Sequence, residues 1–363
     1  MGLVQRSLED IKERRKKILE GGVNCIPSPF NSFRYDFPGV ELGTYYLISG
    51  SSKSSKSKLT NFLFLFNTII YAYNNPDAVR LKIFYCLLEE KAENILMKFM
   101  CYLLYTMNNI RIDIKTLKSV DTGRIVSADI IDLLGSIEYQ GILRFFEEHV
   151  VCVVDRNPTG IYHTLTKYAE THGTIHKKKV EGYDKEIFDY YEPNDPDEYV
   201  MCIVDHISLI STERGMDLRN SIKKLSEYLK IVRNKYNYIP VVVQQQNSQT
   251  NSLEAFKALR ISPTQSGCAD SQDPAKDCDM MIGITNPFAF MLPEYQKYDI
   301  TKLKSWARFM EIVLGRDGES NSVLALYFDG ATGYYAPLPK FTNIAELNKV
   351  YKLIQKNQES ISK

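Results

Sequence analysis

The chain reads Gly50-Ser51-Ser52-Lys53-Ser54-Ser55-Lys56-Ser57 between an apolar run at residues 45–48 and a helical pattern that begins near Leu59. A strand, a polar turn and a helix in this order place backbone N–H groups at a helix start, where they can surround phosphate oxygens. In such a turn a lysine neutralises phosphate charge, and the hydroxyl after it can hold Mg²⁺. The segment is a candidate phosphate-binding loop, with Lys56 and Ser57 in those two roles.

The loop departs from the Walker A pattern, which is Gly, four residues, Gly, Lys and Ser or Thr, only at Ser55. Glycine takes positive φ angles without steric cost, whereas a serine at this position is strained. A flexible, solvated Ser/Lys linker is the competing interpretation, and composition alone favours it. A linker seldom lies between a buried strand and an amphipathic helix, so the loop alone leaves the two interpretations evenly matched. If nucleotide binds here, the residues that hold it are Gly50, Ser54, Ser55, Lys56 and Ser57.

Size and composition are those of an ordinary soluble globular protein. The 363 residues are enough for one large α/β domain with an appendage or for two domains, and 44% are hydrophobic. With 45 basic and 44 acidic side chains, the net charge of +1 neither supports nor excludes DNA binding. Seven cysteines without a C-x-x-C pair fit a reducing cytoplasm. No apolar segment approaches about 18 residues, so neither secretion nor membrane spanning is indicated.

Strand and helix patterns alternate along most of the chain. The helical pattern at residues 92–104 keeps one face apolar, and most of the strand-like runs are continuously apolar, as expected for strands covered on both faces. These runs lie at residues 45–49, 81–88, 150–154, 199–204, 239–243, 280–284 and 310–314. The alternation predicts an α/β fold with a doubly wound, mainly parallel sheet and helices on both faces.

We divide the chain into an N-terminal helix with its connection (1–29), a main domain (30–338) and a polar C-terminal tail (339–363). The N-terminal segment has a possible capping box at residues 7–10, and its thin apolar stripe suits docking on a partner or on its own domain equally. Residues 172–197 form a polar insertion, and residues 247–279 a long polar loop that is a candidate for ligand contact. The tail from residue 341 is expected to be a polar helix that frays into solvent.

Polar side chains end three of the predicted strands, where open α/β sheets bind ligands. Asp205 ends one strand and can hold a Mg²⁺-bound water, although a structural strand-end cap is an equal alternative. Glu89 ends another and can orient a water, but the macrodipole of the following helix also favours acids there. Gln245 follows a third strand, where an amide can sense a terminal phosphate.

The order of these motifs resembles the RecA-type ATPase domain of the DnaB family of hexameric replicative helicases, including phage versions, over roughly residues 30–338. The turn at 39–43, the loop at 50–57, the Leu-Glu-Glu-Lys-Ala-Glu segment at 88–93 and the strand end at 203–206 follow the family's order. Further along the chain, Gln245 and Asn247, residues 270–279 and Gly-Arg-Asp-Gly at 315–318 resemble its later motifs. The family's N-terminal collar domain has no counterpart, and the first helix resembles the linker helix that docks on an adjacent subunit.

The resemblance implies specific roles for individual residues. Glu89 corresponds to the catalytic base, Asp205 to the Walker B carboxylate and Gln245 to the γ-phosphate sensor. Arg316 corresponds to the arginine finger that reaches a neighbouring subunit's nucleotide, but Leu314 stands where the family has a lysine. Ser55 and Leu314 are therefore the two departures at positions that the family uses to bind phosphate.

A DnaB-type ring is the expected assembly, most simply a hexamer, with ATP and Mg²⁺ between subunits and single-stranded DNA in its centre. Lys257 and Arg260, in the long polar loop, are candidates for DNA phosphate contacts, with an ordinary exposed basic pair as the alternative. A separate primase or loader is an expected partner, and the cytoplasm of a bacterium or phage-infected host the expected location. The alternatives are a nonhydrolysing, structural nucleotide-binding relative and a DNA-packaging or recombinase-type ATPase.

Overall fold

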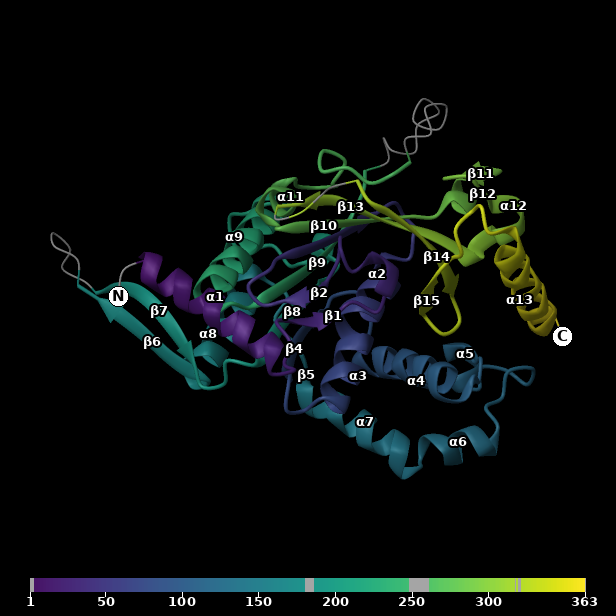
Figure 1. Cartoon of the computed structure of the whole chain (residues 1–363), viewed down its shortest axis with the longest axis horizontal. Helices are drawn as coiled ribbons and strands as arrows, with labels where there is room; N and C mark the ends of the chain where they lie inside the picture. The colour runs from purple at the N-terminus through teal and green to yellow at the C-terminus, as the bar shows by residue number, and fades with distance from the viewer. Residues whose placement is uncertain (1–2, 180–185, 248–260, 317, 319–320, 363) are drawn as a thin grey trace.

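The computed structural model describes residues 3–179, 186–247, 261–316, 318 and 321–362. A nine-stranded sheet runs through the middle of the molecule in the order β15-β14-β13-β10-β3-β9-β8-β4-β5, with helices on both faces (Figure 1). Neighbouring strands from β10 to β5 are parallel, and those from β10 to β15 are antiparallel. The prediction of a doubly wound, mainly parallel sheet is therefore confirmed.

The sheet contains each strand-like run that the sequence predicts, together with two C-terminal strands that it does not. Its strands are β3 (Tyr46–Gly50), β4 (Arg80–Leu87), β5 (Val150–Cys152), β8 (Glu198–Asp205), β9 (Ile239–Gln245), β10 (Met280–Thr285), β13 (Ala307–Gly315), β14 (Val323–Asp329) and β15 (Tyr334–Pro337). Three two-stranded ribbons pair β1 (Cys25–Pro27) with β2 (Gly39–Glu41), β6 (Gly173–Lys178) with β7 (Ile187–Pro193), and β11 (Glu294–Tyr295) with β12 (Tyr298–Asp299).

The described helices vary from one turn to more than four turns. They are α1 (Leu3–Leu19), α2 (Lys56–Thr60), α3 (Asn67–Asn74), α4 (Ala92–Asn108), α5 (Ile114–Leu117), α6 (Ala128–Leu134), α7 (Ile137–His149), α8 (Pro158–Thr171), α9 (Leu218–Tyr236), α11 (Asp273–Asp277), α12 (Ile300–Leu303) and α13 (Ile344–Ser362). A π-helical segment, Asn61–Phe66, joins α2 to α3 without a break. Short 3₁₀ turns are at Asn31–Phe33, Ile207–Leu209, Pro287–Phe290 and Lys304–Trp306.

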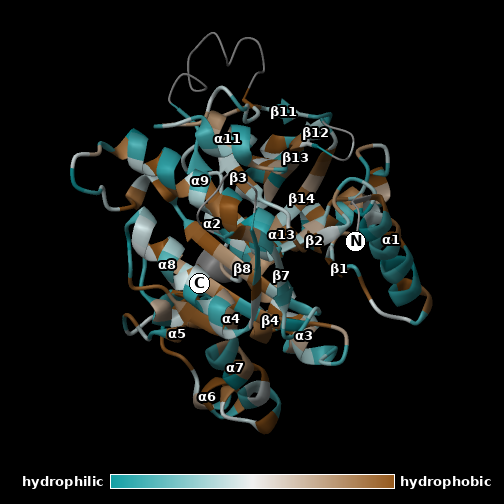
Figure 2. Cartoon of the chain, turned by 90° about the vertical axis from the view of Figure 1, so that its left-hand side faces the viewer, coloured by the Kyte–Doolittle hydropathy of each residue, from teal (hydrophilic) through white to brown (hydrophobic). Residues whose placement is uncertain are grey.

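Alternation of side chains along the buried strands builds two cores, one on each face of the sheet. In β3, Tyr46 and Ile48 pack with α2, α3, α4 and α7, whereas Leu47 packs with α8 and α9 on the opposite face. The hydropathy colouring agrees, because apolar strands lie between helices whose outer faces are hydrophilic (Figure 2). This burial on both faces explains why the strands read as continuous apolar runs.

Two expectations about the chain ends are wrong. Helix α1 begins at Leu3, so Ser7 lies inside the helix and cannot cap it, because an N-cap residue needs a non-helical backbone. The tail is a helix, α13, as expected, but it does not extend freely into solvent, because Leu347 and Ile354 are buried against the cluster around Trp306 and Tyr327. Within the described segments, no helix is both long and apolar enough to cross a bilayer.

The polar segment at residues 172–197 contains the hairpin β6–β7, which Figure 1 shows projecting beside α1. In the long loop after β9, the described part is also structured, since it contains α11 and a bridge between Gln246 and Cys268. Lys257 and Arg260 lie outside the described residues.

Candidate functional site

The loop between β3 and α2 is shaped by close contacts that require its first glycine. A Cβ atom on Gly50 would lie 2.5 Å from the carbonyl oxygen of Ile284 and 2.5 Å from Oγ of Ser54, which is buried. The amide of Asn286 donates to the carbonyl of Lys53 over 3.2 Å. These contacts hold the turn against β10 and aim the first backbone N–H groups of α2 toward the carboxyl edge of the sheet.

Ser55, the departure from the glycine pattern, adopts the left-handed conformation that glycine would take, with φ 75° and ψ 33°. Its Oγ accepts hydrogen bonds from Nε (3.2 Å) and Nη2 (3.0 Å) of Arg308 in β13. The hydroxyl of Tyr335 in β15 donates to its carbonyl oxygen over 3.2 Å. The serine therefore keeps the backbone shape of the loop, with partners that the sequence did not reveal.

Lys56 begins α2 and folds back over the loop, where its Nζ donates to the carbonyl of Ser51 over 3.0 Å. Burial lowers the pKa of this ammonium to about 8, and the carboxylates of Asp205 and Glu89 oppose that shift. Both acids are thus electrostatic neighbours of Lys56, as the sequence predicted.

Asp205 ends β8 and turns toward the first helical turn of α2. Its Oδ1 accepts a hydrogen bond from Oγ of Ser57 over 3.0 Å, and its Oδ2 one from the hydroxyl of Tyr85 over 3.4 Å. Burial raises the pKa of Asp205 to about 6, partly offset by the Ser57 hydrogen bond and reinforced by Glu89. A hydroxyl and a carboxylate in contact beside a phosphate loop fit Mg²⁺, which takes few protein oxygens and completes its shell with water and phosphate.

Glu89 follows β4, which lies next to β8 in the sheet, with Leu87 paired to Asp205. Its side chain is exposed, whereas the adjacent Glu90 bonds to Lys98 over 2.7 Å. Of these two acids, Glu89 is therefore the one left to face the space around Lys56. In the described part of the chain, no cluster of three or more His, Cys, Asp or Glu side chains could bind a metal alone.

Gln245 ends β9 opposite Gly50, since the two are paired in the parallel register of β3 and β9. The neighbouring amides are committed elsewhere: Gln244 donates to the carbonyls of Ala269 and Ser271, and Gln246 to Oγ of Ser49. Strand alternation turns Gln245 to the face opposite these two.

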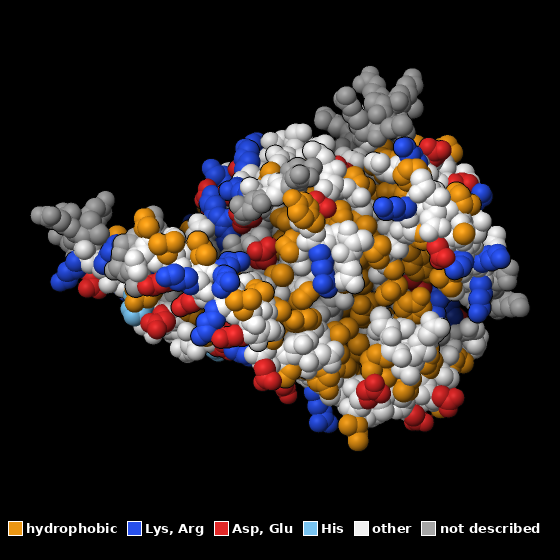
Figure 3. Space-filling view, viewed as in Figure 1, with side chains coloured by type: hydrophobic (Ala, Val, Ile, Leu, Met, Phe, Trp, Pro, Cys, Tyr) orange, Lys and Arg blue, Asp and Glu red, His pale blue; other side chains and the backbone are white. Residues whose placement is uncertain are grey.

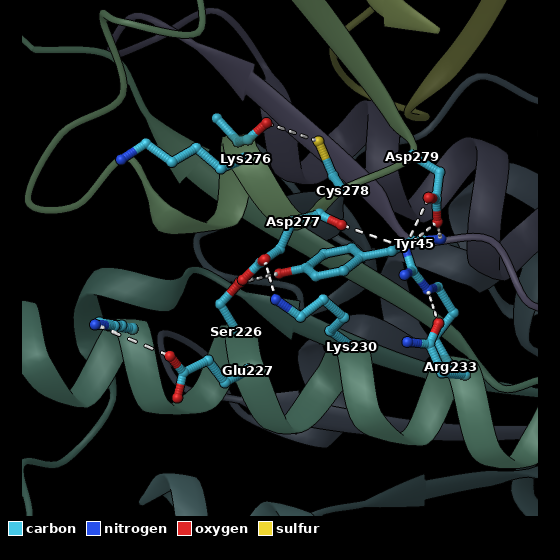
Figure 4. A network of polar contacts seen from close by, with 12 residues as sticks. Tyr45, Ser226, Glu227, Lys230, Arg233, Lys276, Asp277, Cys278 and Asp279 are labelled. Atoms are coloured by element: carbon cyan, nitrogen blue, oxygen red, sulfur yellow. Dashed lines mark hydrogen bonds and ion pairs between the residues drawn. The ribbon is translucent and has the colours of Figure 1, made fainter. Parts of the chain in front are cut away.

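Arg316 lies away from the loop of its own chain. Its Nη2 donates to the carbonyl of Lys276 over 2.7 Å, its Nε is 3.9 Å from Asp279, and its side chain is about half exposed. Nearby, Asp277 binds Ser226 and Lys230, and Asp279 binds Arg233 and the backbone of Tyr45 (Figure 4). This network fixes α11 and the start of β10 to α9.

Sequence reasoning missed two residues beside the loop. His206 follows Asp205. Burial lowers the pKa of its imidazole, the carboxylate of Glu89 raises that pKa, and the ammonium of Lys56 lowers it. The charges of Glu89 and Lys56 both act on His206, so it lies among the site residues. Its Nδ1 is buried without a hydrogen-bond partner among the described residues. Arg308 is the second missed residue. It lies near the start of an apolar strand, where no sequence pattern indicates a role at the loop.

A cavity of about 1070 Å³ lies beside α2, on the side of Arg308. Its walls combine the aromatic rings of Trp306 and Phe328 with the cations Lys58, Lys98 and Arg308. Such a lining suits a ligand with both an apolar and an anionic part.

No family model matches the sequence, and no curated protein matches it either. Solved structures do match the fold. One structure solved as an ATPase domain superposes with a TM-score of 0.61 at 13% identity, over 93% of this chain and 100% of that one. A DnaB-like replicative helicase, studied with its interactions with primase, superposes with a TM-score of 0.59 at 12% identity, over 93% of this chain and 67% of that one. The chain therefore has the RecA-like P-loop fold of the DnaB-like helicase ATPase domains.

Proposed function

We propose that the chain is an ATP-dependent DNA helicase motor of the DnaB type, which hydrolyses ATP at subunit interfaces and moves along single-stranded DNA during replication. The observation that carries the proposal is the grouping of Lys56, Ser57, Asp205 and Glu89 at the carboxyl edge of β3, β4 and β8. Basic, hydroxyl and carboxylate groups in this arrangement are what phosphoryl transfer needs.

Each residue of the site has a role in this proposal. Ser57 and Asp205 hold Mg²⁺, which supplies charge neutralisation for the phosphates when bound. Lys56 gives up its bond to Ser51 and neutralises the terminal phosphates, which the loop amides also bind. Glu89 accepts the proton of the attacking water, and its exposure leaves it free to do so.

Two further residues have roles in this proposal, and one of them, Arg316, requires a neighbouring subunit. Arg316 is exposed and lies away from its own loop, which suits an arginine finger acting on the nucleotide of the next subunit. Gln245, at the end of β9 beside Gly50, senses the γ-phosphate and passes its state to the loop that follows. A closed ring, most simply a hexamer, would complete every site in this way.

The partners in this proposal are single-stranded DNA in the ring centre and a separate primase or loader, in the cytoplasm of a bacterium or a phage-infected host. Lys257 and Arg260 remain the proposed DNA contacts. A nonhydrolysing relative is the second candidate, because Leu314 replaces the family's lysine. A packaging or recombinase-type ATPase shares the fold and is the third.

Turnover of ATP, measured with and without single-stranded DNA, tests the proposal in three variants. We expect Glu89→Gln to lower turnover by about 10²–10⁴-fold while fluorescent mant-ATP still binds, because only the base is lost. Lys56→Ala should lose mant-ATP binding itself. The matched control is Glu90→Gln, whose carboxylate already serves Lys98 and which should stay within a few-fold of the parent.

The alternatives give different results. A nonhydrolysing relative binds mant-ATP through Lys56 but shows no turnover that Glu89→Gln can reduce. A packaging enzyme or recombinase shows turnover without unwinding of a forked DNA duplex.

A further inference from the structure

Arg308 is a buried cation without an acidic partner. Its side chain is 4% exposed, and among the described residues no carboxylate lies within ion-pair distance of its guanidinium. Burial lowers its pKa to about 10, so it remains charged at neutral pH. An isolated charge in the interior is costly, and proteins retain one where its field or its hydrogen bonds are needed.

Oxygen atoms of the phosphate loop, of the 3₁₀ turn before β13 and of β13 itself accept the hydrogen bonds of this guanidinium. Nη1 donates to the carbonyls of Ser305 (3.0 Å) and Ala307 (2.7 Å), which anchor the side chain at the start of β13. Nε donates to the carbonyl of Ser54 (3.1 Å) and, together with Nη2, to Oγ of Ser55. The ring of Phe328 lies against the guanidinium, with its centroid 4.5 Å away.

These bonds reach the one loop position that departs from the glycine pattern. Ser55 holds a positive φ angle, which costs energy for a residue with a Cβ atom. Glycine has no Oγ, so a glycine at this position could not accept these hydrogen bonds from Arg308. In this chain the hydrogen bonds from Arg308 to Oγ of Ser55, together with the Tyr335 bond to its carbonyl, hold the serine in that conformation.

We propose that Arg308 is a positioning residue that replaces the conformational freedom of the second Walker A glycine, by holding Ser55 left-handed and the loop open for phosphate. Its relevance to nucleotide rests on the proposed function, but its effect on the loop does not. A second consequence follows from its charge, which lies directly behind the loop and adds to the field that attracts phosphate.

The test uses the nucleotide-free chain and two readouts: hydrogen exchange of the loop peptide around residues 50–59, and the Kd for mant-ATP with Mg²⁺. Ser55→Ala removes only the oxygen that accepts the hydrogen bonds of Arg308. We expect faster loop exchange and a Kd at least about tenfold higher, because a hydrogen bond to a charged group is lost and the strained φ remains. Ser55→Gly should bind mant-ATP at least about tenfold more tightly than Ser55→Ala, because glycine adopts this φ freely.

A double-mutant cycle separates positioning from a general packing role. Arg308→Lys keeps a cation but loses the planar fork, and should weaken mant-ATP binding as Ser55→Ala does. In the Ser55→Gly background the same change should weaken binding less, because, of its bonds to the loop, only the one to the carbonyl of Ser54 remains to be lost. Equal behaviour of Ser55→Ala and Ser55→Gly, or an equal loss from Arg308→Lys in both backgrounds, overturns the proposal.

The two proposals fail in different ways. If the parent does not bind mant-ATP but Ser55→Ala still speeds loop exchange, the nucleotide function is wrong and the positioning role stands. If Arg308→Lys does not fold, the two Ser55 variants still decide the question, because neither alters the buried cation.

Discussion

Lys56 and Asp205 carry opposite charges, yet burial favours the uncharged form of each side chain. The pKa of Lys56 falls to about 8 and that of Asp205 rises to about 6, so each has its titration moved toward neutral pH. In the proposed function, bound phosphate would favour the ammonium of Lys56 and bound Mg²⁺ the carboxylate of Asp205, so both pKa shifts would be reversed.

The alkaline side of this behaviour gives a direct prediction. Above pH 8 the ammonium of Lys56 is deprotonated in the empty protein, so binding an anionic nucleotide must take up a proton. The affinity for mant-ATP should therefore fall as pH rises through about 8, approaching tenfold per unit. In Lys56→Arg the guanidinium stays charged, so its affinity should stay flat over the same range. A decline of equal slope in both proteins would contradict the assignment.

Individual site residues were predictable where their type and strand-end position sufficed. The placement of Asp205 and Glu89 follows from the parallel sheet, because carboxyl ends of parallel strands meet at one edge, and that of Lys56 and Ser57 from the order of strand, polar turn and helix. Arg308 did not, since its role depends on an antiparallel strand whose register no local pattern encodes. Lys257 and Arg260 lie outside the described residues and stay predictions.

At the scale of elements, the C-terminal antiparallel strands support the loop from the side. Arg308 lies near the start of β13, and Arg316 follows its last residue. One strand therefore joins the residue that holds the loop to the proposed arginine finger. β14 ends at Asp329, whose side chain is fully buried and accepts Arg111 at 2.6 and 3.0 Å. Arg111 also lies over the ring of Trp306. This pair fastens the α4–α5 connection to the C-terminal strands along the wall of the cavity.

Breaking this pair should destabilise the fold. Arg111→Met leaves Asp329 buried without its cation, which typically costs about 3–5 kcal/mol. The control is Arg124→Met, because Arg124 and Asp121 are 3.8 Å apart with 46% and 54% of their side chains exposed. Such a surface pair contributes about 0–1 kcal/mol. Thermal unfolding followed by circular dichroism should show a fall in Tm of several degrees for the first variant only; equal shifts would count against a special role of Asp329.

Element prediction succeeded where burial imposes a period and failed at the ends of the chain. The helix at residues 92–104 and the apolar runs appear as α4 and the core strands, because burial on both faces leaves a strong pattern. The N-cap assigned to Ser7 was wrong because Leu3 and the residues after it already continue the helix. The tail was misjudged because two buried residues, Leu347 and Ile354, decide its docking against a mostly polar background.

At the scale of the whole molecule, the face drawn in Figure 3 has mixed rather than polarised charge. Figure 3 shows Lys and Arg interspersed with Asp and Glu, with hydrophobic side chains gathered in the middle of the face. With a net charge of +1, any attraction to DNA in the proposed motor would have to come from a local basic surface rather than from the whole molecule. The proposed motor also depends on assembly.

Helix α1 offers a surface for that assembly. Its later part is tied to its own chain by Lys17 with Asp197 and by Arg14 with Glu41, while an apolar stripe stays exposed. The stripe consists of Val4, Leu8, Ile11 and Ile18, which are spaced to share one side of the helix. Exposed apolar side chains in such a row are typical of an interface.

We predict that Ile11→Glu, at a position 60% exposed in the single chain, raises the concentration needed for assembly. Burying an isoleucine in a subunit interface contributes about 1.5–3 kcal/mol, which is tenfold or more in Kd. Light scattering after gel filtration, with Mg²⁺ and ATP present, should show the variant as smaller species at concentrations where the parent is assembled. Lys16→Glu, on another side of α1 with its side chain 73% exposed, is the matched control and should assemble like the parent. If both variants assemble like the parent, α1 lies on its own domain and the ring must close through other surfaces.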